Sequence, residues 1–354
     1  MIDCGILTFQ YAHNYGALLQ AYALKTFLNS NNIEAEIINY ASIQAKEMYA
    51  FFPSRIYGGV DFLRKGKRCF LRARQYFLMK KFAENYMEYN ITRPFSEQKR
   101  ISGKYKSILV GSDQVWNIQL TNNDLAYFLE NIKCENSISY AASFGSSELI
   151  KSLPVKCVNL LKGFDSISVR EAEAKNKLIS IIEKDVSIVV DPVFLLSPDD
   201  WKKLERKPKS IRKRYCCLVM LRDDSKLVEQ CREYADKKNI EIISIHPMAW
   251  KQKCGRQLYD VGPQEFLWLI DHADCIVTNS FHATAFSVIF RKKVITSAIS
   301  KGNDRISSLI QMLSGANTLD PDELIDTNEF HADIINDRVN ESKKYLLENL
   351  LKTN

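Results

Sequence analysis

Short apolar runs alternate with longer amphipathic segments along the first half of the chain. The runs are rich in β-branched residues and too short for helices, which is typical of strands. They lie at residues 4–9, 34–40, 107–111, 137–143, 166–169 and 187–190. Segments 15–29, 151–162 and 171–182 repeat apolar residues at helical spacing. Strands that alternate with helices predict a parallel sheet with crossover helices on both faces.

This alternation stops at 198–214, a polar segment with two prolines that we interpret as a linker, and then starts again. New strands are predicted at 215–221, 241–245, 274–278 and 293–296. New helices are predicted near 225–237, 263–272 and 304–313, and from about His282. The pattern therefore predicts an N-terminal α/β domain over 1–197, a smaller α/β domain over 215–332 and a C-terminal helix over 333–354.

Two open α/β sheets of this kind place their ligands in the crevice between them, outside the carboxyl ends of the strands. The residues that directly follow each predicted strand are therefore the candidates for a functional site. We take the four segments after the strands at 4–9, 107–111, 166–169 and 274–278 as the candidates.

The first of these segments leads from the first strand into the first helix. Asn14 and Gly16 stand at the helix start, where free N–H groups can meet an anion or a sugar oxygen. His13 and Tyr15 lie beside them and are further candidates for contact with an acceptor substrate. A tight turn that needs Gly16 for close packing explains the same residues. The segment is neither a GxGxxG motif nor a Walker loop.

The second segment, SDQVWN, follows the strand at 107–111. Asp113, beside Ser112, is placed to accept a proton from a sugar hydroxyl. An aspartate that only caps a helical turn is the alternative. Trp116 suits either packing in the core or stacking on a sugar.

The last two segments supply an arginine and a histidine from different halves of the chain. Arg170 follows the strand at 166–169 and suits bidentate recognition of a carboxylate or phosphate, although a surface pair with a nearby glutamate is also possible. His282 follows the strand at 274–278 at a helix start, where it either makes a local hydrogen bond or serves anion binding and proton transfer. Together the two residues predict a site for a small dianion.

Composition narrows the classes of function. The chain has 354 residues, of which 46% are hydrophobic and 26% charged, as is ordinary for a globular protein. Its net charge of +7 suits an acidic small substrate or a membrane surface. This charge does not by itself indicate a nucleic-acid partner. The nine cysteines include no C-x-x-C pair, as expected for reduced thiols in a cytoplasmic protein. Neither a secretory signal nor a membrane span is predicted, and no metal-binding spacing occurs.

One segment, 61–82, combines helical spacing with eight Lys or Arg residues. Leu63, Phe70 and Phe77 fall on one side of the predicted helix. Such a helix could lie on an anionic membrane surface, close to an acceptor carried by a lipid. A charged helix that is simply solvated is the alternative.

Several stretches resemble the polysaccharide pyruvyl transferase family in the order in which they occur. They are GILTFQYAHNYGALLQAYAL, VGSDQVWN, SYAASFG, ISVRE, VVDPVFLL and VTNSFHATAFSVIF, and the resemblance runs from residue 5 to about 315. The segment at about 45–100 matches least.

The resemblance implies two Rossmann-like domains that face each other across a cleft, similar to B-type glycosyltransferases. It implies transfer of the pyruvyl group of phosphoenolpyruvate onto a sugar as a ketal, in bacterial capsule, exopolysaccharide or cell-wall glycan assembly, with no cofactor beyond this co-substrate. Arg170 and His282, with Ser280 and Phe281, would contact the donor. Lys292 or Lys293 is the less secure candidate for a lysine of the family.

Some relatives carry an additional arginine just before the SFH-like pair. Here that place holds Asn279 and Ser280, so the donor's charge must be met in another way. We expect protonated His282 to neutralise the phosphate and to donate a proton, and Asp113 or His13 to take one from the acceptor. The acceptor would be a free sugar or a lipid-linked oligosaccharide. A nucleotide-sugar glycosyltransferase and a non-catalytic glycan-assembly protein are the alternatives.

Overall fold

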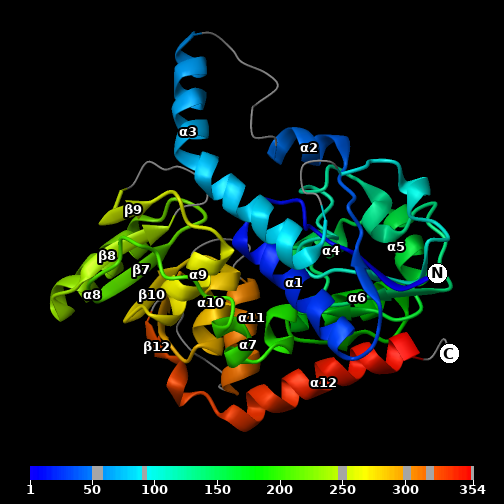
Figure 1. Ribbon diagram of the computed structural model, residues 1–354. Helices are drawn as coiled ribbons and strands as arrows, with labels where there is room; N and C mark the ends of the chain where they lie inside the picture. The colour runs from blue at the N-terminus through cyan, green and yellow to red at the C-terminus, as the bar shows by residue number, and fades with distance from the viewer. Residues whose placement is uncertain (50–58, 90–93, 246–252, 298–303, 316–322, 352–354) are drawn as a thin grey trace.

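The computed structural model describes residues 1–49, 59–89, 94–245, 253–297, 304–315 and 323–351. Two β-sheets occupy the two halves of the molecule, and helix α1 (Tyr15–Ser30) lies between them (Figure 1). The α/β fold predicted from the pattern, with two Rossmann-like units, is confirmed.

The first sheet has the order β2-β1-β3-β4, and all its neighbouring strands are parallel. Its strands are β1 (Ile2–Leu7), β2 (Ala35–Ile37), β3 (Tyr105–Val110) and β4 (Asn136–Ser139). A parallel pair, β5 (Ser168–Val169) and β6 (Ser187–Ile188), continues beside β4 through isolated bridges such as Ala142 with Val169. Each of these strands lies within, or overlaps, one of the apolar runs that predicted a strand.

The second sheet has the order β12-β11-β10-β7-β8-β9, and only the β11–β12 pair is antiparallel. Its strands are β7 (Tyr215–Val219), β8 (Glu241–Ile245), β9 (Arg256–Leu258), β10 (Cys275–Thr278), β11 (Lys293–Thr296) and β12 (Leu324–Asp326). The apolar pattern did not predict β9 and β12. Both are edge strands of three residues with charged or polar members, so they leave no apolar run.

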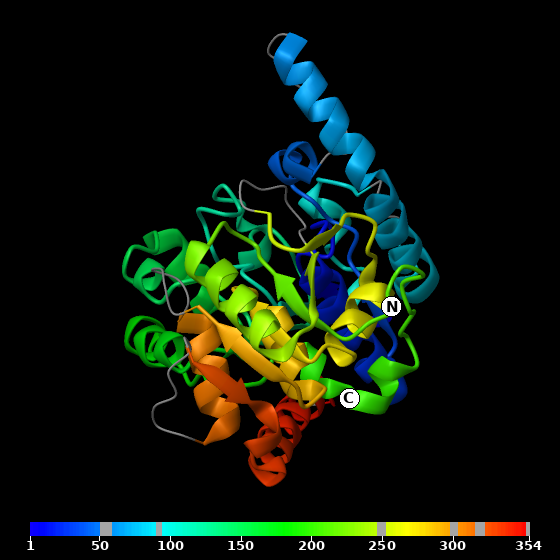
Figure 2. The same ribbon diagram turned by 90° about the vertical axis from the view of Figure 1, so that its left-hand side faces the viewer.

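Helices cover both sheets (Figure 2). They are α1, α2 (Ile43–Tyr49), α3 (Gly59–Phe82), α4 (Glu148–Lys151), α5 (Val155–Lys162), α6 (Ala172–Ile182), α7 (Pro198–Lys202), α8 (Ser225–Lys238), α9 (Pro263–Asp271), α10 (Phe281–Ile289), α11 (Asp304–Ser314) and α12 (Ala332–Leu351). Among the helices of the described residues, none is long and apolar enough to cross a membrane.

The two halves share a hydrophobic core around α1. The ring of Tyr15 stacks on Phe266 of α9, with centroids 4.6 Å apart. Trp201, in the segment interpreted as a linker, is fully buried and packs edge-on against Phe286 of α10. The linker segment therefore includes α7 and supplies part of the contact between the halves.

Helix α12 returns from the second half to the first, along the lower side of the molecule in Figure 1. The hydroxyl of Tyr345 donates to the carbonyl of Ser139, and the amide of Asn136 donates to the carbonyl of Asn349. Leu346 and Leu350 are buried in a core cluster of the first half. These contacts join the C-terminal helix to the first sheet.

Candidate functional site

The strand orders define one reversal point in each sheet. In the first sheet β1 lies between β2 and β3, and in the second sheet β7 lies between β8 and β10. Crevices open where the strand order reverses, at the carboxyl ends of the strands. The segments that follow β1, β3 and β10 therefore begin at these crevices, and they hold Gly16, Asp113 and His282.

His282 lies in the first turn of α10, where the hydroxyl of Ser280 caps the helix by accepting from the N–H of Ala283. Its imidazole is buried against the start of α1, so close to Gly16 that a methyl group there would overlap the ring. Nε2 lies 3.7 Å from Asp191 Oδ2 and has no hydrogen-bond partner among the described residues. The histidine of the second half thus reaches the first half.

Burial lowers the pKa of His282, and the nearby carboxylate of Asp191 only partly opposes this effect. The positive end of α1 also disfavours a charged ring at this place. The imidazole is therefore neutral in the free protein at pH 7. The predicted imidazolium therefore requires a bound anion beside the ring, and its role in proton transfer stays a prediction.

Arg170 is the charged centre of the same group, and only 1% of its side chain is exposed. Its Nη1 donates to Asp191 Oδ2 at 2.9 Å, and its Nε donates to Glu171 Oε1 at 3.0 Å. The guanidinium carbon lies 4.2 Å from the centre of the Phe281 ring, a cation–π contact with the second half. Nη2 has no hydrogen-bond partner among the described residues.

Asp191 joins the two predicted residues, and the apolar pattern alone did not single it out. One of its oxygens, Oδ2, lies near the side chains of Arg170, Ser112 and His282. The residue is buried and follows directly on the apolar run at 187–190. Its place after a strand-like run was the signal that could have found it.

Ser112 supports this carboxylate and does not face a substrate. It is fully buried, and its hydroxyl lies 3.0 Å from Asp191 Oδ2 and 3.1 Å from the carbonyl of Ala141. The predicted contact of Ser112 with an acceptor is therefore corrected to a supporting role.

Asp113 lies next to the group in a left-handed backbone conformation, with φ at 73°. Its Oδ1 accepts from the N–H of Gln114 at 2.8 Å and lies 3.7 Å from Arg170 Nη2. The bond to Gln114 is local and no helix follows it, so Asp113 does not cap a helical turn, and its role as a proton acceptor stays a prediction. A non-glycine residue held at positive φ is frequently found at functional sites.

Arg305, at the start of α11, is a member of the group that the sequence interpretation missed. Burial lowers its pKa, and the positive charge of Arg170 lowers it further, so the two guanidinium groups are electrostatic neighbours. Its Nε is buried and has no hydrogen-bond partner within the described residues. Two arginines, one from each half, thus lie near each other, and Arg170 Nη2 and Arg305 Nε have no acceptor among the described residues.

A cavity of about 380 Å³ adjoins this group between the halves. Gly145, Ser146 and Glu171 line it from the first half, and Arg305 and Ser308 line it from α11. Glu171 Oε2 is buried and also lacks a hydrogen-bond partner among the described residues. The cavity is large enough for a small organic anion and carries both charge signs on its wall.

Two predicted acceptor contacts, Trp116 and Tyr15, are buried in the core instead. Trp116 is fully buried, its Nε1 donates to the carbonyl of Tyr127, and its ring packs on Phe144. The hydroxyl of Tyr15 donates to the carbonyl of Val261 and accepts from Gln75. Neither ring has a free face for a sugar, so both predictions are corrected to packing roles.

Asn14 and His13 are placed at the entrance to α1. Asn14 Oδ1 accepts from the N–H of Gly16 and caps the helix, a role that the sequence interpretation did not include. His13 is half-buried and meets Tyr76 of α3 edge-on at 4.7 Å. Burial, followed by the charge of Arg72, lowers the pKa of His13 to about 4, so it is neutral at pH 7.

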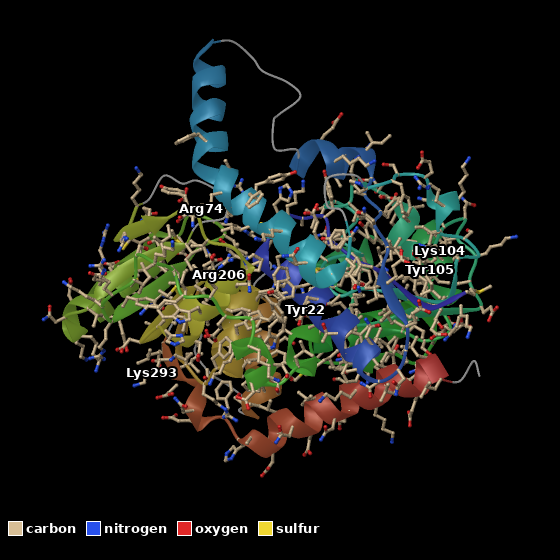
Figure 3. All side chains as sticks on the ribbon, in the orientation of Figure 1. Tyr22, Arg74, Lys104, Tyr105, Arg206 and Lys293 are labelled. Atoms are coloured by element: carbon tan, nitrogen blue, oxygen red, sulfur yellow. The ribbon has the colours of Figure 1, made fainter. Side chains whose placement is uncertain are left out.

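Lys292 and Lys293 do not join the group. They stand at the amino end of β11, whereas His282 follows the carboxyl end of the parallel neighbour β10. Lys293 pairs with Asp326 at 3.6 Å and lies at the outer edge of the second sheet (Figure 3). The predicted donor contact of these lysines is corrected, because parallel strands put them at the opposite edge of the sheet.

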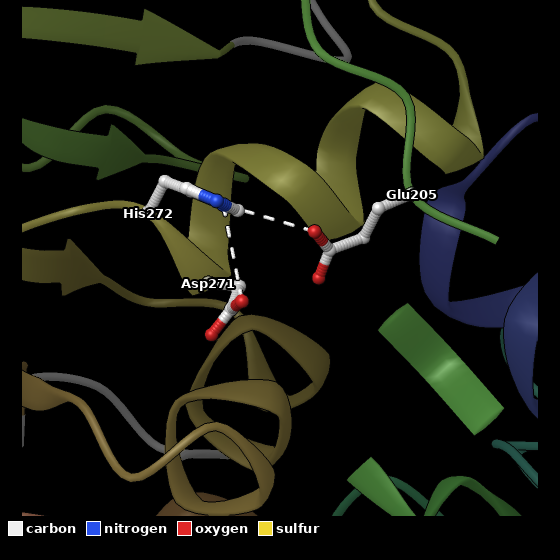
Figure 4. A group of neighbouring side chains, drawn as sticks. All are labelled: Glu205, Asp271 and His272. Atoms are coloured by element: carbon white, nitrogen blue, oxygen red, sulfur yellow. Dashed lines mark ion pairs between the residues drawn. The ribbon is translucent and has the colours of Figure 1, made fainter. Parts of the chain in front are cut away.

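A second polar group lies at that opposite edge: Glu205, Asp271 and His272 (Figure 4). His272 Nδ1 is 3.7 Å from Glu205 Oε2 and 3.8 Å from Asp271 Oδ2. Burial, followed by the charge of Asp271, raises the pKa of Glu205 to about 7. Nδ1 also lies 3.1 Å from the carbonyl of Trp268, so a hydrogen bond within α9 competes with any metal for this nitrogen.

Gly16→Ala is expected to lower activity by about 100-fold, because the added methyl group must displace the imidazole of His282 and misplaced groups lose rate steeply. Steady-state turnover measures the effect. The control is Gly16→Ala combined with His282→Ala, which should match His282→Ala alone since no ring is left to displace. A further loss in the double variant would contradict this explanation.

Comparisons with known proteins complete the description. A family model for polysaccharide pyruvyl transferase matches residues 14–300. No curated protein matches the sequence closely enough to count as a relative.

Among solved structures, the chain is similar to UDP-GlcNAc 2-epimerase from Neisseria meningitidis bound to UDP-GlcNAc, with 13% identity, a TM-score of 0.46 and 99% of each chain covered. It is also similar to the epimerase from Methanocaldococcus jannaschii in complex with UDP-GlcNAc and UDP, with 16% identity, a TM-score of 0.45 and coverage of 97% of this chain and 99% of that one. Likenesses at this level carry no argument about the ligand of this chain.

Proposed function

Since the chain belongs to the polysaccharide pyruvyl transferase family, we propose that it transfers the pyruvyl group of phosphoenolpyruvate onto a sugar as a ketal. The sugar belongs to a bacterial surface polysaccharide or to its lipid-linked precursor. One observation supports the donor above all: Arg170 Nη2, Arg305 Nε and His282 Nε2 are buried without hydrogen-bond partners among the described residues.

Unpartnered buried polar groups are costly, at about 1–3 kcal/mol each, and a bound anion would remove that cost. Phosphoenolpyruvate offers a carboxylate and a phosphate, and guanidinium groups bind both kinds of oxygen by charge-assisted hydrogen bonds. In this proposal Arg170 and Arg305 share the donor from the two halves. Arg305 then supplies the charge that relatives obtain from the arginine before the SFH-like pair, where this chain has Asn279.

His282 would acquire its proton as the donor binds, because a phosphate dianion beside the ring favours the imidazolium. The imidazolium then delivers the proton to the methylene carbon, and the C=C bond becomes a methyl group beside a cationic carbon. A sugar hydroxyl attacks that carbon and loses its proton to a base. The bond to the phosphate oxygen breaks, a second hydroxyl closes the ketal, and its proton leaves with the phosphate.

Asp113 is the base that the geometry favours. Its carboxylate is close to Arg170, whereas the ring of His13 packs against Tyr76 of α3. Glu171 Oε2 is a further acceptor on the cavity wall and can hold a hydroxyl of the sugar. The proposal therefore puts the acceptor in the cavity between the loop at 144–147 and α11, and the reaction in the cytoplasm, where phosphoenolpyruvate is made.

The direct test is phosphate release from phosphoenolpyruvate in the presence of soluble and lipid-linked glycosides, with mass detection of the product. A product heavier by one pyruvyl ketal supports the proposal. If no glycoside in a broad panel yields phosphate, and phosphoenolpyruvate does not bind, the proposal fails.

Donor binding gives a separate prediction. Phosphoenolpyruvate at about 100 times its Kd should raise the Tm by roughly 3–4 °C, and UDP-GlcNAc should not. Arg305→Ala should weaken donor binding about 10- to 100-fold, since one charge-assisted hydrogen bond and one charge are lost. Arg338→Ala is the control, because Arg338 is exposed and, among the described residues, its ion-pair partner is Glu341 of the same helix α12. Stabilisation by UDP-GlcNAc and not by phosphoenolpyruvate would favour a nucleotide-sugar transferase.

A further inference from the structure

Helix α3 extends away from the body of the molecule (Figures 1 and 2). It has 24 residues, which corresponds to a length of about 36 Å. Its carboxyl-terminal part is anchored: Met79 and Phe82 are buried, and Gln75 donates to the hydroxyl of Tyr15 at 2.6 Å. The helix is therefore held firmly at one end and free of the sheets at the other.

Its outward face carries large apolar side chains in water. Phe70 is 81% exposed and Phe77 is 60% exposed, and Phe70 is the most exposed large apolar residue of those described. Arg74 lies between them and is largely exposed, and its Nη1 is 3.4 Å from Asp260 Oδ2. A spacing of four and seven residues puts the three side chains on one face of the helix. We call Phe70, Arg74 and Phe77 the outer face of α3.

The charge of the chain is concentrated in this helix. Residues 59–82 contain eight Lys or Arg and one acidic residue, Asp61, which gives a net charge of +7. The whole chain has 49 basic and 42 acidic residues, so the remainder has 41 of each sign and is formally neutral. The net positive charge of the protein is thus the charge of α3.

We propose that the outer face of α3 docks on the surface of a bilayer that contains anionic phospholipids. Exposed aromatic rings on a basic helix enter the headgroup region, and Lys or Arg side chains near an anionic surface are attracted to it. Helix α2 lies at the same end of the molecule in both views, and its Ile43 is also largely exposed. Docking would hold the protein where a sugar on a lipid carrier is presented.

Flotation with vesicles tests the proposal on the full-length protein. The wild type should bind vesicles with about 30% phosphatidylglycerol and not vesicles of phosphatidylcholine alone, and about 0.5 M NaCl should release most of it. Phe70→Ser combined with Phe77→Ser should lower partitioning at least ten-fold. Val155→Ser is the matched control, because Val155 is 76% exposed on α5 and lies outside α3.

Circular dichroism and Tm should be unchanged in both variants, since the altered side chains are solvent-exposed. Vesicle binding needs neither donor nor acceptor, so the result is independent of the proposed activity. Equal binding of the wild type and the Phe70→Ser/Phe77→Ser variant, or equal binding to neutral and anionic vesicles, would overturn the proposal. Failure of the wild type to bind any vesicle would also overturn the proposal. If the wild type is then found to be a dimer, and the Phe70→Ser/Phe77→Ser variant a monomer, the outer face of α3 serves self-association.

Discussion

Replacing His282 by alanine should lower turnover by about 10²–10⁴-fold, the usual contribution of a general acid or base. The effect should fall on kcat more than on donor affinity, because Arg170 and Arg305 remain. Folding should be largely retained, since the lost ring has no hydrogen-bond partner for Nε2 among the described residues. Steady-state kinetics with phosphoenolpyruvate and a competent acceptor provide the measurement.

The pH dependence distinguishes proton transfer from simple positioning. Burial lowers the pKa of His282 in the free protein, so the protonated form is lost at a lower pH than for an ordinary histidine. If imidazolium is the active form, kcat/KM should fall with increasing pH from this low value. A bound phosphate dianion raises the pKa, so kcat should fall only at higher pH.

Both decreases with pH, that of kcat/KM and that of kcat, should disappear in His282→Ala. His272→Ala is the control, because His272 is on the opposite edge of the second sheet and should leave both profiles unchanged. Profiles in which kcat and kcat/KM fall at the same pH, or full turnover by His282→Ala, would remove His282 from proton transfer.

Sequence reasoning located Arg170 and His282 because parallel strands end at one edge of a sheet and both residues follow such strands. It could not locate Arg305, which begins α11 without a strand directly before it in the described residues. An arginine in the first turn of an amphipathic helix looks the same whether it faces water or a cavity. What distinguishes the two cases is the place of Arg305 on the wall of the cavity that α11 shares with the first half.

The same rule explains the errors. Lys292 and Lys293 are close to His282 in the chain, but they lie at the amino end of β11, so the sheet separates them from the site. Trp116 lies beside polar residues in sequence, yet the loop after β3 turns its ring into the core. Periodicity predicts which segments form elements, and it does not specify which way a loop side chain points.

Arg170→Ala is expected to destabilise the protein by about 3–5 kcal/mol, in addition to abolishing donor binding. The guanidinium is hydrogen-bonded to two buried carboxylates, Asp191 and Glu171, and its loss leaves both without their cation. Uncompensated buried charge is among the most costly changes a mutation can make. Chemical denaturation measures the free energy of unfolding, and the exposed Arg338→Ala should change it by less than about 0.5 kcal/mol.

A second substitution separates charge imbalance from lost packing. Asp191→Asn removes one of the stranded charges but keeps an oxygen that can accept from the N–H of Val193. Because removing both members of a buried pair costs less than removing one, Arg170→Ala with Asp191→Asn should be more stable than Arg170→Ala alone. Strictly additive losses would show that the arginine stabilises the fold by packing on Phe281 and not by balancing the carboxylates. The same carboxylates fix the direction of the guanidinium. We therefore expect the double variant to recover stability but not donor binding, which would assign to Arg170 both the balancing of the buried carboxylates and the binding of the donor.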